Sequence, residues 1–271
     1  MRKKIYFSII ALMVSLAVGA QTRESVDLGL PSKTLWATCN VGAEAPEELG
    51  DYFAWGETEP NKSYYDWGTY DWCWVDGVLH RYTKYCVFND YGTPDNKREL
   101  ESKDDAAYVN WGKEWCMPTN DQIMELINKD YTTTEFTKLN GVEGLLITSK
   151  RNGNSIFLPA AGSIMGGTRF GYGDGIGGKN YDGHYWCKTG YDNVVTQIQF
   201  IGSMKSVVKT YGIRSNGMSI RPVSKKKATT TSIVEVTDNQ EASKSGKYIS
   251  GGNLVIVKDG KKYNANGIEI K

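Results

Sequence analysis

Residues 26–57 read VDLGLPSKTLWATCNVGAEAPEELGDYFAWGE, and this stretch carries the clearest structural signal in the chain. Two short apolar and aromatic runs, 33–38 and 51–55, stand between segments rich in Gly, Pro and Asn. Runs of this kind, bounded by turn residues, predict β-strands that are joined by turns. We therefore expect the chain to open with strands and loops.

The same alternation continues to residue 223 and predicts a sheet-rich domain. Further strands are expected at 145–149, 155–159, 184–188, 194–201, 207–211 and 218–223. Asn152-Gly153 stands between the first two of these segments. Because this dipeptide accepts a positive φ at little cost, it predicts a β-hairpin there.

Helical patterns are few. Thr119 is followed three residues later by Gln122, which is the pattern of a capping box, and the segment 123–127 adds an apolar face. Asp104 can cap a second, shorter helix that runs through Asn110. Two helices beside several small sheets predict an α+β class.

Several segments of the chain resemble one bacterial family. They are the opening stretch, DDAAYVNWG (104–112), WCMPT (115–119), NGNSIFLPAAG (152–162), HYW (184–186) and SIRPV (219–223). In this order they are similar to the Fibrobacter succinogenes major paralogous domain family, which is abundant in secreted proteins of gut Bacteroidetes, and together they cover most of residues 26–223. The resemblance implies a C-type-lectin-like fold with short twisted antiparallel sheets, two helices and long loops. It also implies that Arg221 is a buried structural hydrogen-bond donor, because charged residues are rarely buried without partners.

The amino terminus predicts export. A basic cluster at 2–4 precedes an apolar run at 5–18, and small residues follow up to Ala20, so residues 1–20 have the pattern of a signal peptide that is cleaved near Ala20. This apolar run is shorter than the ~20 residues of a membrane-spanning helix. The mature chain is therefore expected to be secreted, periplasmic or on the outer cell surface, without a transmembrane anchor.

The composition changes after residue 223. Residues 224–246 are polar and poor in aromatic side chains, which predicts a linker. In the tail, 247–271, short apolar runs alternate with Asp259-Gly260 and Asn266-Gly267, which predicts two or three very short strands in a hairpin-like arrangement. A lone hairpin is marginal in water, so the tail is expected to dock or to act as a sorting signal, or else to be a small appendage.

Charge excludes one class of partner. The formal net charge of the chain is +1, but the predicted signal and the tail are basic, which leaves about −6 for residues 21–223. Nucleic-acid binding requires a concentrated basic surface, so no nucleic-acid partner is expected.

The five cysteines permit bridges in an oxidising compartment, and their odd number leaves at least one thiol unpaired. Cys73 and Cys86 flank a short loop and are one candidate pair. Cys116 and Cys187 both replace residues that the resembled family often has, which suggests a second pair. The alternative is that these are buried thiols, and Cys39 is expected to be a small core residue.

No linear motif of a hydrolase, metalloprotease, phosphate-binding loop or zinc site occurs, and the two histidines are His80 and His184. We therefore expect no catalysis. Asp174 and Asp182 lie in a Gly-rich segment, 171–183, but calcium requires six to eight oxygen ligands. No cofactor or metal is expected, with calcium as the remaining candidate.

Aromatic residues give the best indication of a ligand. Segment 64–74, YYDWGTYDWCW, holds six aromatic residues, of which Trp72 and Trp74 are as readily explained by core packing. The candidate contact residues are Tyr64, Tyr65, Trp67 and Tyr70 in this segment, and Tyr172, Asp174, Tyr181, Asp182, Tyr185 and Tyr191 further along the chain. Such rings beside carboxylates suit glycan or protein contact. The sequence therefore predicts a noncatalytic binding module for a glycan or a protein at the cell exterior. The alternative is a structural component of a surface or fimbria-like assembly that attaches through its tail.

Overall fold

The computed structural model describes residues 23–77, 79–171, 181–192 and 194–224, and four short tail segments at 245–250, 253–258, 261–264 and 269–270. The predicted signal peptide lies outside the described residues, as do residues 225–244 of the predicted linker. The candidate residues Tyr172 and Asp174 also lie outside them.

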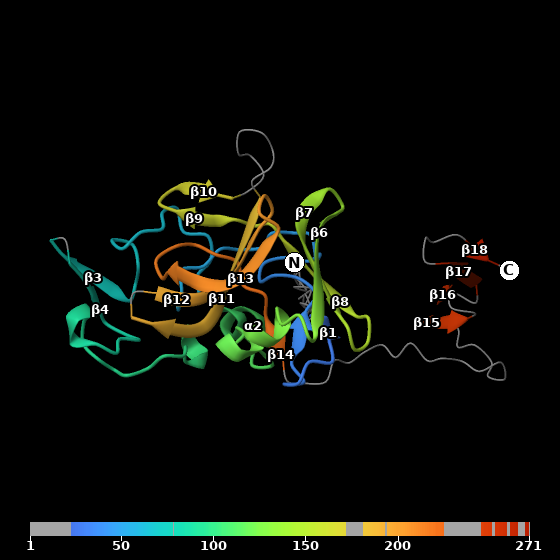
Figure 1. Cartoon of the computed structure of the whole chain (residues 1–271), viewed down its shortest axis with the longest axis horizontal. Coiled ribbons are helices and arrows are strands. Elements are labelled where there is room, and N and C mark those ends of the chain that lie inside the picture. Colours follow the sequence, from blue (N-terminus) through green and yellow to red (C-terminus); the bar gives the residue numbers. More distant parts are fainter. Residues whose placement is uncertain are drawn as a thin grey trace, which may run out of the picture.

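One antiparallel sheet joins the beginning of the described chain to residue 224. Its strands are β1 (Ser25–Asp27), β2 (Leu35–Ala37), β14 (Val223–Ser224) and β5 (Trp115–Cys116), in this spatial order. Val223 pairs with Trp36 on one side and with Cys116 on the other. The first and the last strand between residues 23 and 224 therefore belong to the same sheet. Figure 1 shows β1 and β14 close together.

Two three-stranded meanders form the larger sheets. The first contains β6 (Thr132–Leu139), β7 (Val142–Ser149) and β8 (Ser155–Pro159). The second contains β11 (Asp182–Tyr191), β12 (Val194–Ile201) and β13 (Ser206–Ile213). The predicted hairpin between β7 and β8 is confirmed, with Thr148 opposite Ser155 and Gly153 at φ 74°.

Two isolated hairpins complete the sheets of residues 23–224. They are β3 (Cys73–Asp76) with β4 (Leu79–Tyr82), and β9 (Ser163–Met165) with β10 (Thr168–Phe170). In Figure 1 the β3–β4 hairpin forms one end of the molecule, the β6–β8 meander lies on the opposite side, and β11–β13 lie between them.

The helices are short. They are α1 (Ala106–Trp111) and α2 (Asn120–Leu126), with 3-10 turns η1 (Asn89–Tyr91) and η2 (Ser102–Asp104). The capping box of α2 is confirmed, because Thr119 and Gln122 each accept the other's main-chain N–H. The cap of α1 is Asp105 rather than the predicted Asp104, which lies in η2.

The expected α+β, C-type-lectin-like class is wrong, because strands hold 42% and helices only 10% of the part of the chain that the structure describes. Each α-helix makes about two turns. α1 stops at Gly112, which adopts φ 94°. Residues 132–139, TTTEFTKL, form a strand that the sequence analysis did not predict. Its four threonines are β-branched, and this favours a pleated strand.

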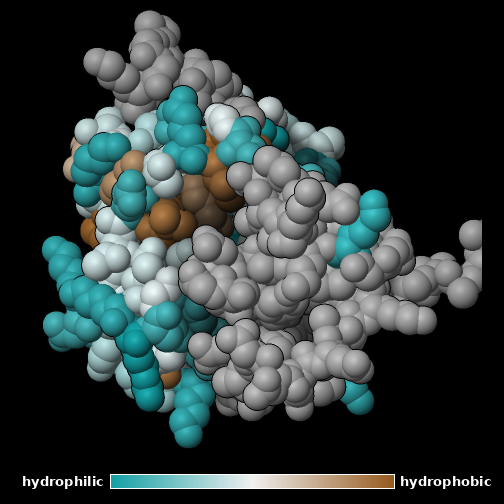
Figure 2. Space-filling model, turned by 90° about the vertical axis from the view of Figure 1, so that its right-hand side faces the viewer, coloured by the Kyte–Doolittle hydropathy of each residue, from teal (hydrophilic) through white to brown (hydrophobic). Residues whose placement is uncertain are grey.

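The core is enclosed by sheets and loops, and two arginines lie within it. Hydrophobic side chains fill three clusters, which are built around Trp36, Trp186 and Tyr65. On the coloured part of the face in Figure 2, hydrophilic side chains predominate and hydrophobic ones gather mainly in one patch. Arg214 and Arg221 are fully buried, so the predicted burial of Arg221 is confirmed.

The predicted disulfides are not formed. All five cysteines are among the described residues, and none of them is in a disulfide. The β3–β4 register places Cys73 opposite Tyr82, and Cys86 lies beyond the end of β4, where its thiol donates to Phe88 O at 3.2 Å. Cys187 is buried, and burial raises the pKa of its thiol to about 12. The predicted pairs Cys73–Cys86 and Cys116–Cys187 are therefore thiols rather than disulfides.

The tail forms an antiparallel meander of β15 (Ser245–Ser250), β16 (Asn253–Lys258), β17 (Lys261–Asn264) and β18 (Glu269–Ile270). Residues 251–271 thus supply three strands, as predicted, and β15 is an additional one. In the described parts of the chain, no helix has the length and hydrophobicity that crossing a membrane requires.

Asp105→Ala is expected to lower the free energy of unfolding by about 2–3 kcal/mol. The buried carboxylate accepts the main-chain N–H groups of Ala107, Tyr108 and Met117, and alanine would leave all three without this acceptor. Urea unfolding followed by circular dichroism measures the change. Exposed Asp90→Ala is the control, and equal stability of the two variants would contradict the prediction.

Candidate functional site

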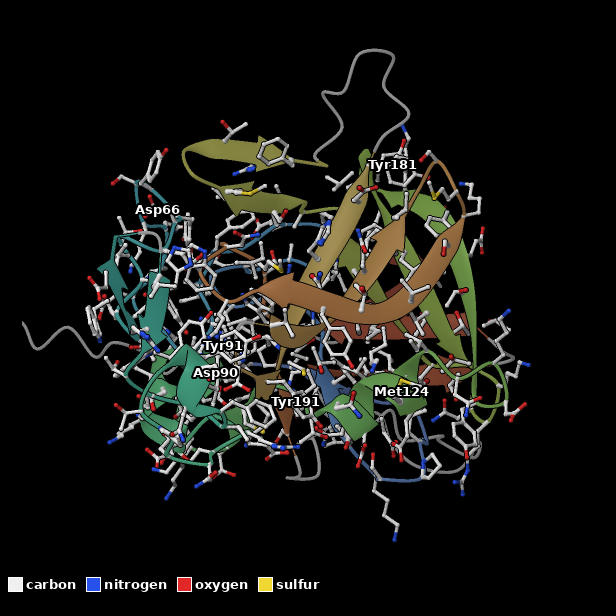
Figure 3. The ribbon with its side chains drawn as sticks, turned by 60° about the vertical axis from the view of Figure 1, so that its left-hand side comes forward. Asp66, Asp90, Tyr91, Met124, Tyr181 and Tyr191 are labelled. Carbon is white, nitrogen blue, oxygen red and sulfur yellow. The ribbon has the colours of Figure 1, made fainter. Side chains whose placement is uncertain are left out.

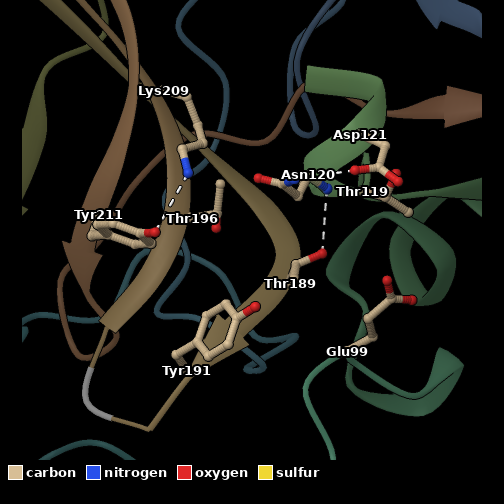
Figure 4. Close-up of a pocket in the computed structure, with 9 residues that line it drawn as sticks. All are labelled: Glu99, Thr119, Asn120, Asp121, Thr189, Tyr191, Thr196, Lys209 and Tyr211. Carbon is tan, nitrogen blue, oxygen red and sulfur yellow. Dashed lines mark hydrogen bonds between the residues drawn. The ribbon is translucent and has the colours of Figure 1, made fainter. Parts of the chain in front are cut away.

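A pocket of about 280 Å³ opens on one face of the β11–β13 sheet, and we call it the tyrosine pocket (Figure 4). It is lined by Glu99, Thr119, Asn120, Asp121, Thr189, Tyr191, Thr196, Lys209 and Tyr211. These residues come from all three strands of the sheet, from the start of α2 and from the loop before η2.

Strand register brings the two tyrosines to the same face. Tyr191 pairs with Val194, which pairs with Ile213, and Thr196 pairs with Tyr211. Directly paired residues project to the same side of an antiparallel sheet, as do residues two apart on one strand. Tyr191 and Tyr211 therefore both project from the face that bears the pocket.

The opposite wall is held against the sheet by main-chain contacts. The Asn120 N–H, at the start of α2, donates to Thr189 Oγ1 at 3.3 Å. Glu99 forms an isolated bridge with Thr189. Both contacts end on β11, so the polar wall and the sheet are fixed relative to each other.

Cations lie against both tyrosine rings. The Arg98 guanidinium is 4.7 Å from the centroid of the Tyr191 ring. Lys209 Nζ is 4.8 Å from the centroid of the Tyr211 ring and 3.4 Å from its hydroxyl oxygen. Such contacts contribute ~0.5–1 kcal/mol at exposed sites. They restrict the orientation of rings that remain 40% and 51% exposed.

The acidic side of the pocket is partly compensated. Glu99 Oε2 lies 3.9 Å from Lys188 Nζ, and Asp121 Oδ1 accepts a hydrogen bond from Asn120 Nδ2 at 3.2 Å. The nine lining residues include no serine, cysteine or histidine, so they lack the usual nucleophile and base pair. Exposed rings beside amide and carboxylate groups are suited to holding a small polar molecule.

The structure corrects two of the candidates in segment 64–74. Tyr65 and Tyr70 are buried, not exposed. The Tyr65 hydroxyl donates to Tyr52 O at 2.8 Å, and burial raises its pKa to about 12. The Tyr70 hydroxyl donates to Trp55 O at 2.6 Å. Both phenols serve the core as hydrogen-bond donors, which explains why polar aromatic residues are buried here.

The other aromatic residues of that segment are only partly as predicted. Tyr64 is 50% exposed, as predicted. Trp67 is half-buried and stacks on the His80 ring, with centroids 4.8 Å apart. Core packing was one of the two interpretations of Trp72 and Trp74. Trp74 is 53% exposed on β3, whereas Trp72 is half-buried and donates its indole N–H to Gly56 O at 2.9 Å.

The candidates around β11 do not form one site. Tyr181 and Tyr185 are buried, and Asp182 is half-buried. The Tyr185 hydroxyl donates to Pro159 O, and burial raises its pKa. Tyr181 and Tyr191 lie at opposite ends of β11 (Figure 3), which at ~3.3 Å per residue separates them by about 30 Å. Among the described candidates, only Tyr191 lines the tyrosine pocket.

Of the nine lining residues, only Tyr191 was predicted from the sequence. Segment 207–211 reads VVKTY, a predicted strand that ends in a tyrosine. This pattern could have suggested Tyr211 as a contact residue. No local pattern connects it with Asn120 or Glu99, because that juxtaposition depends on how α2 packs on the sheet.

The described part of the chain contains no group of three or more His, Cys, Asp or Glu side chains that could hold a metal ion. Asp174, one of the two carboxylates considered for calcium, lies outside the described residues.

His184 should make stability depend on pH. Its Nδ1 lies 3.2 Å from Gln197 Oε1, and burial lowers its pKa below the ordinary value of about 6.5. The unfolded chain therefore binds this proton more readily than the folded one. The contribution of neutral His184 is complete above pH ~6.5 and is lost as the pH falls through the lowered folded pKa. Urea unfolding at pH 7.5, 6.5 and 5.5 should give a falling free energy that His184→Gln makes flatter. Identical pH profiles of the two proteins would contradict this.

Comparisons of this chain with protein-family models, with curated proteins and with solved structures find no match. The resemblance to the Fibrobacter succinogenes major paralogous domain family therefore stays a prediction.

Proposed function

We propose that this protein is a noncatalytic binding module that holds a glycan in the tyrosine pocket. The observation that carries the proposal is the placement of exposed Tyr191 and Tyr211 on one sheet face, opposite Asn120 and two carboxylates. The predicted signal peptide and the family resemblance support a location at the cell exterior, where glycans are abundant.

The chemistry of a sugar ring fits these groups. A pyranose has apolar C–H faces and a rim of hydroxyl groups. Tyrosine rings offer a flat apolar surface with a polar tip, which suits the C–H faces. Glu99, Asp121 and Asn120 supply acceptors and donors for the hydroxyl groups. The volume of about 280 Å³ lies just below the range of typical ligand pockets, ~300 to 1,000 Å³, which favours a short sugar unit.

The pocket requires little ordering before it binds. The side-chain hydroxyl and the main chain of Thr189 hold the polar wall, and cations lie against both rings. Side chains that are already oriented lose less conformational entropy on binding. This supports a recognition role without chemistry on the ligand.

The binding test has two stages. An array of glycans is screened with the mature full chain, and the affinity for a glycan that binds is then measured by calorimetry. Tyr211→Ala and Tyr191→Ala should each weaken the affinity by about tenfold or more, which corresponds to ~1.4 kcal/mol.

Tyr131→Ala is the matched control, because Tyr131 is 38% exposed and is not among the nine lining residues. It should bind like the unaltered chain. Wild-type affinity in both pocket variants, or no binding to any glycan, would overturn the proposal.

A second candidate is a structural subunit of a surface assembly, and the position of β13 favours it. β13 is an edge strand of its sheet, and Val208, Tyr211 and Ile213 on it are exposed. An exposed apolar edge can accept a strand from another chain. Cell fractionation and sedimentation of the full chain and of a chain truncated after residue 224 test this, and identical location and assembly would contradict a role for the tail.

A further inference from the structure

Lys84 and Asp104 are in direct contact inside the molecule. Lys84 Nζ contacts Asp104 Oδ2, and the two side chains are only 14% and 6% exposed. The contact joins a residue just after β4 to a residue in η2, 20 positions later. Most other ion pairs of the described chain are more open, such as Lys97 with Glu101, at 44% and 37% exposed.

Aromatic and acidic groups surround this contact. Lys84 Nζ lies 4.6 Å from the centroid of the Trp72 ring and 5.0 Å from that of the Tyr85 ring. The Tyr85 hydroxyl donates to Asp104 Oδ2, the same oxygen that Lys84 contacts. Glu101 Oε2 lies 3.4 Å from Lys84 Nζ. An amine, a carboxyl group and a hydroxyl donor therefore converge in a largely buried site, and a more exposed second carboxylate lies at its edge.

The main chain fixes both partners. Buried Arg214 donates from Nη2 to Lys84 O at 3.0 Å and from Nη1 to Tyr85 O at 3.2 Å. Asp104 N–H donates to Glu101 O at 2.9 Å within the η2 turn. Reacting groups held in contact in this way gain a large effective concentration, on the order of 10⁵ M or more.

We propose that Lys84 and Asp104 form an intramolecular isopeptide bond. The ammonium group first passes a proton to the carboxylate, which gives a neutral amine and a neutral acid. The proton moves along the direct contact between Lys84 Nζ and Asp104 Oδ2. The Nζ lone pair then attacks Asp104 Cγ and forms the C–N bond, while the Tyr85 hydroxyl stabilises the carboxyl oxygen that it contacts.

Glu101 completes the proton transfers. It takes a proton from the attached nitrogen and returns it to the departing hydroxyl group, and the C–O bond breaks with release of one water. The products are one amide and one water, with Glu101 in its initial state. No oxidant, reductant or further reactant is required.

The bond would cross-link a region that no disulfide holds. It ties the end of β4 to the η2 turn, and so closes the loop that contains η1. Unlike a disulfide, an amide persists under reducing conditions. Lys62 and Glu57 form another ion pair, at 2.7 Å, with side chains that are 22% and 1% exposed. This pair serves as an internal control, because within the described residues no aromatic ring lies over the Lys62 ammonium group.

Peptide mapping of the denatured full chain tests the proposal directly. Trypsin should not cleave at Lys84, so peptide 82–97 should appear joined to peptide 104–113, at a mass lower by one water than the sum of the two. Cleavage at Lys62 should be normal. Free peptides that end at Lys84 in the unaltered chain would overturn the proposal, and so would a link to peptide 99–103, which contains Glu101.

Variants separate the roles of the groups. Asp104→Ala should abolish the branched peptide, whereas Asp90→Asn, which alters an exposed carboxylate between the two partners in the chain, should keep it in full. Glu101→Gln should slow formation of the branched peptide in freshly purified protein by tenfold or more. A side chain that transfers protons usually accelerates a reaction by about 10²–10⁴-fold. Full and equally rapid formation in Glu101→Gln would remove Glu101 from the mechanism.

Discussion

Arg214→Met is expected to lower the free energy of unfolding by about 3–5 kcal/mol. The fully buried guanidinium donates to the main-chain oxygens of Lys84, Tyr85 and Asp192. Methionine has no donor, and the three carbonyl groups belong to the backbone, so no second substitution can remove them. Each carbonyl would stay buried without this donor, at a cost of about 1–3 kcal/mol if no water replaces it.

Arg214 also fills space between aromatic rings. Its guanidinium carbon lies 4.5 to 5.3 Å from the ring centroids of Tyr82, Trp55 and Tyr70. Methionine would keep part of this packing but would lose the cation–π attraction. The expected loss therefore comes mainly from the orphaned carbonyl groups rather than from a cavity.

Chemical unfolding in urea measures this effect. Arg151→Met is the control, because Arg151 is exposed, and it should change the free energy of unfolding by no more than about 0.5 kcal/mol. Equal stability of the two variants would show that the Arg214 network contributes little to folding.

Arg221→Met should destabilise the protein by a similar amount, about 3–5 kcal/mol. Arg221 donates to Asn40 Oδ1 at 2.9 Å, to Thr38 O at 2.8 Å and to Phe157 O at 2.8 Å, with a further bond to Ala37 O at 3.1 Å. Ala37 belongs to β2 and Phe157 to β8, so one side chain ties two sheets together.

Burial limits what the charge of Arg221 contributes. Desolvation lowers the pKa of Arg221 to about 10, which shows that the surroundings do not fully replace water around the cation. The net value of the residue is therefore less than the sum of its hydrogen bonds. Removing the side chain nevertheless lowers the free energy of unfolding, because its four acceptors stay buried without a donor.

Arg221→Lys separates charge from geometry. A lysine keeps the positive charge, but its ammonium group cannot span four acceptors as a planar guanidinium does. It should recover only a small part of the loss in urea unfolding, whereas Arg151→Lys should behave like the unaltered chain. Full recovery by lysine would show that charge, rather than the fork of donors, is what the site requires.

Local signals in the sequence predicted local structure well. Asn152-Gly153 indicated a hairpin, and β7 and β8 pair across it. Thr119 and Gln122 indicated a capping box, and both of its hydrogen bonds are present. These features depend on residues that are close in the chain, so a short stretch contains all of the groups that form them.

The fold class was not predicted correctly, because strand content depended on segments without a clear pattern. The segment 132–139 is polar and alternates weakly, yet it forms the edge strand β6 after pairing with β7. Conversely, residues 51–55 have a strand-like composition but form only an isolated bridge, between Phe53 and Met218. Pairing partners therefore decided these cases, and the propensity of the segment did not.

The sequence by itself determined the Asn152-Gly153 turn, the cap of α2 and a supply of aromatic residues. Tertiary structure alone decided which of these aromatic residues are exposed. The hydroxyl groups of Tyr65 and Tyr70 donate to main-chain oxygens inside the core, whereas Trp74 is exposed on a two-stranded hairpin. The tyrosine pocket likewise required the register of β11, β12 and β13 and a contact between Asn120 and Thr189, 69 residues apart. The physical reason is that burial and convergence are properties of packed elements, and a short segment of chain contains only one side of each such contact.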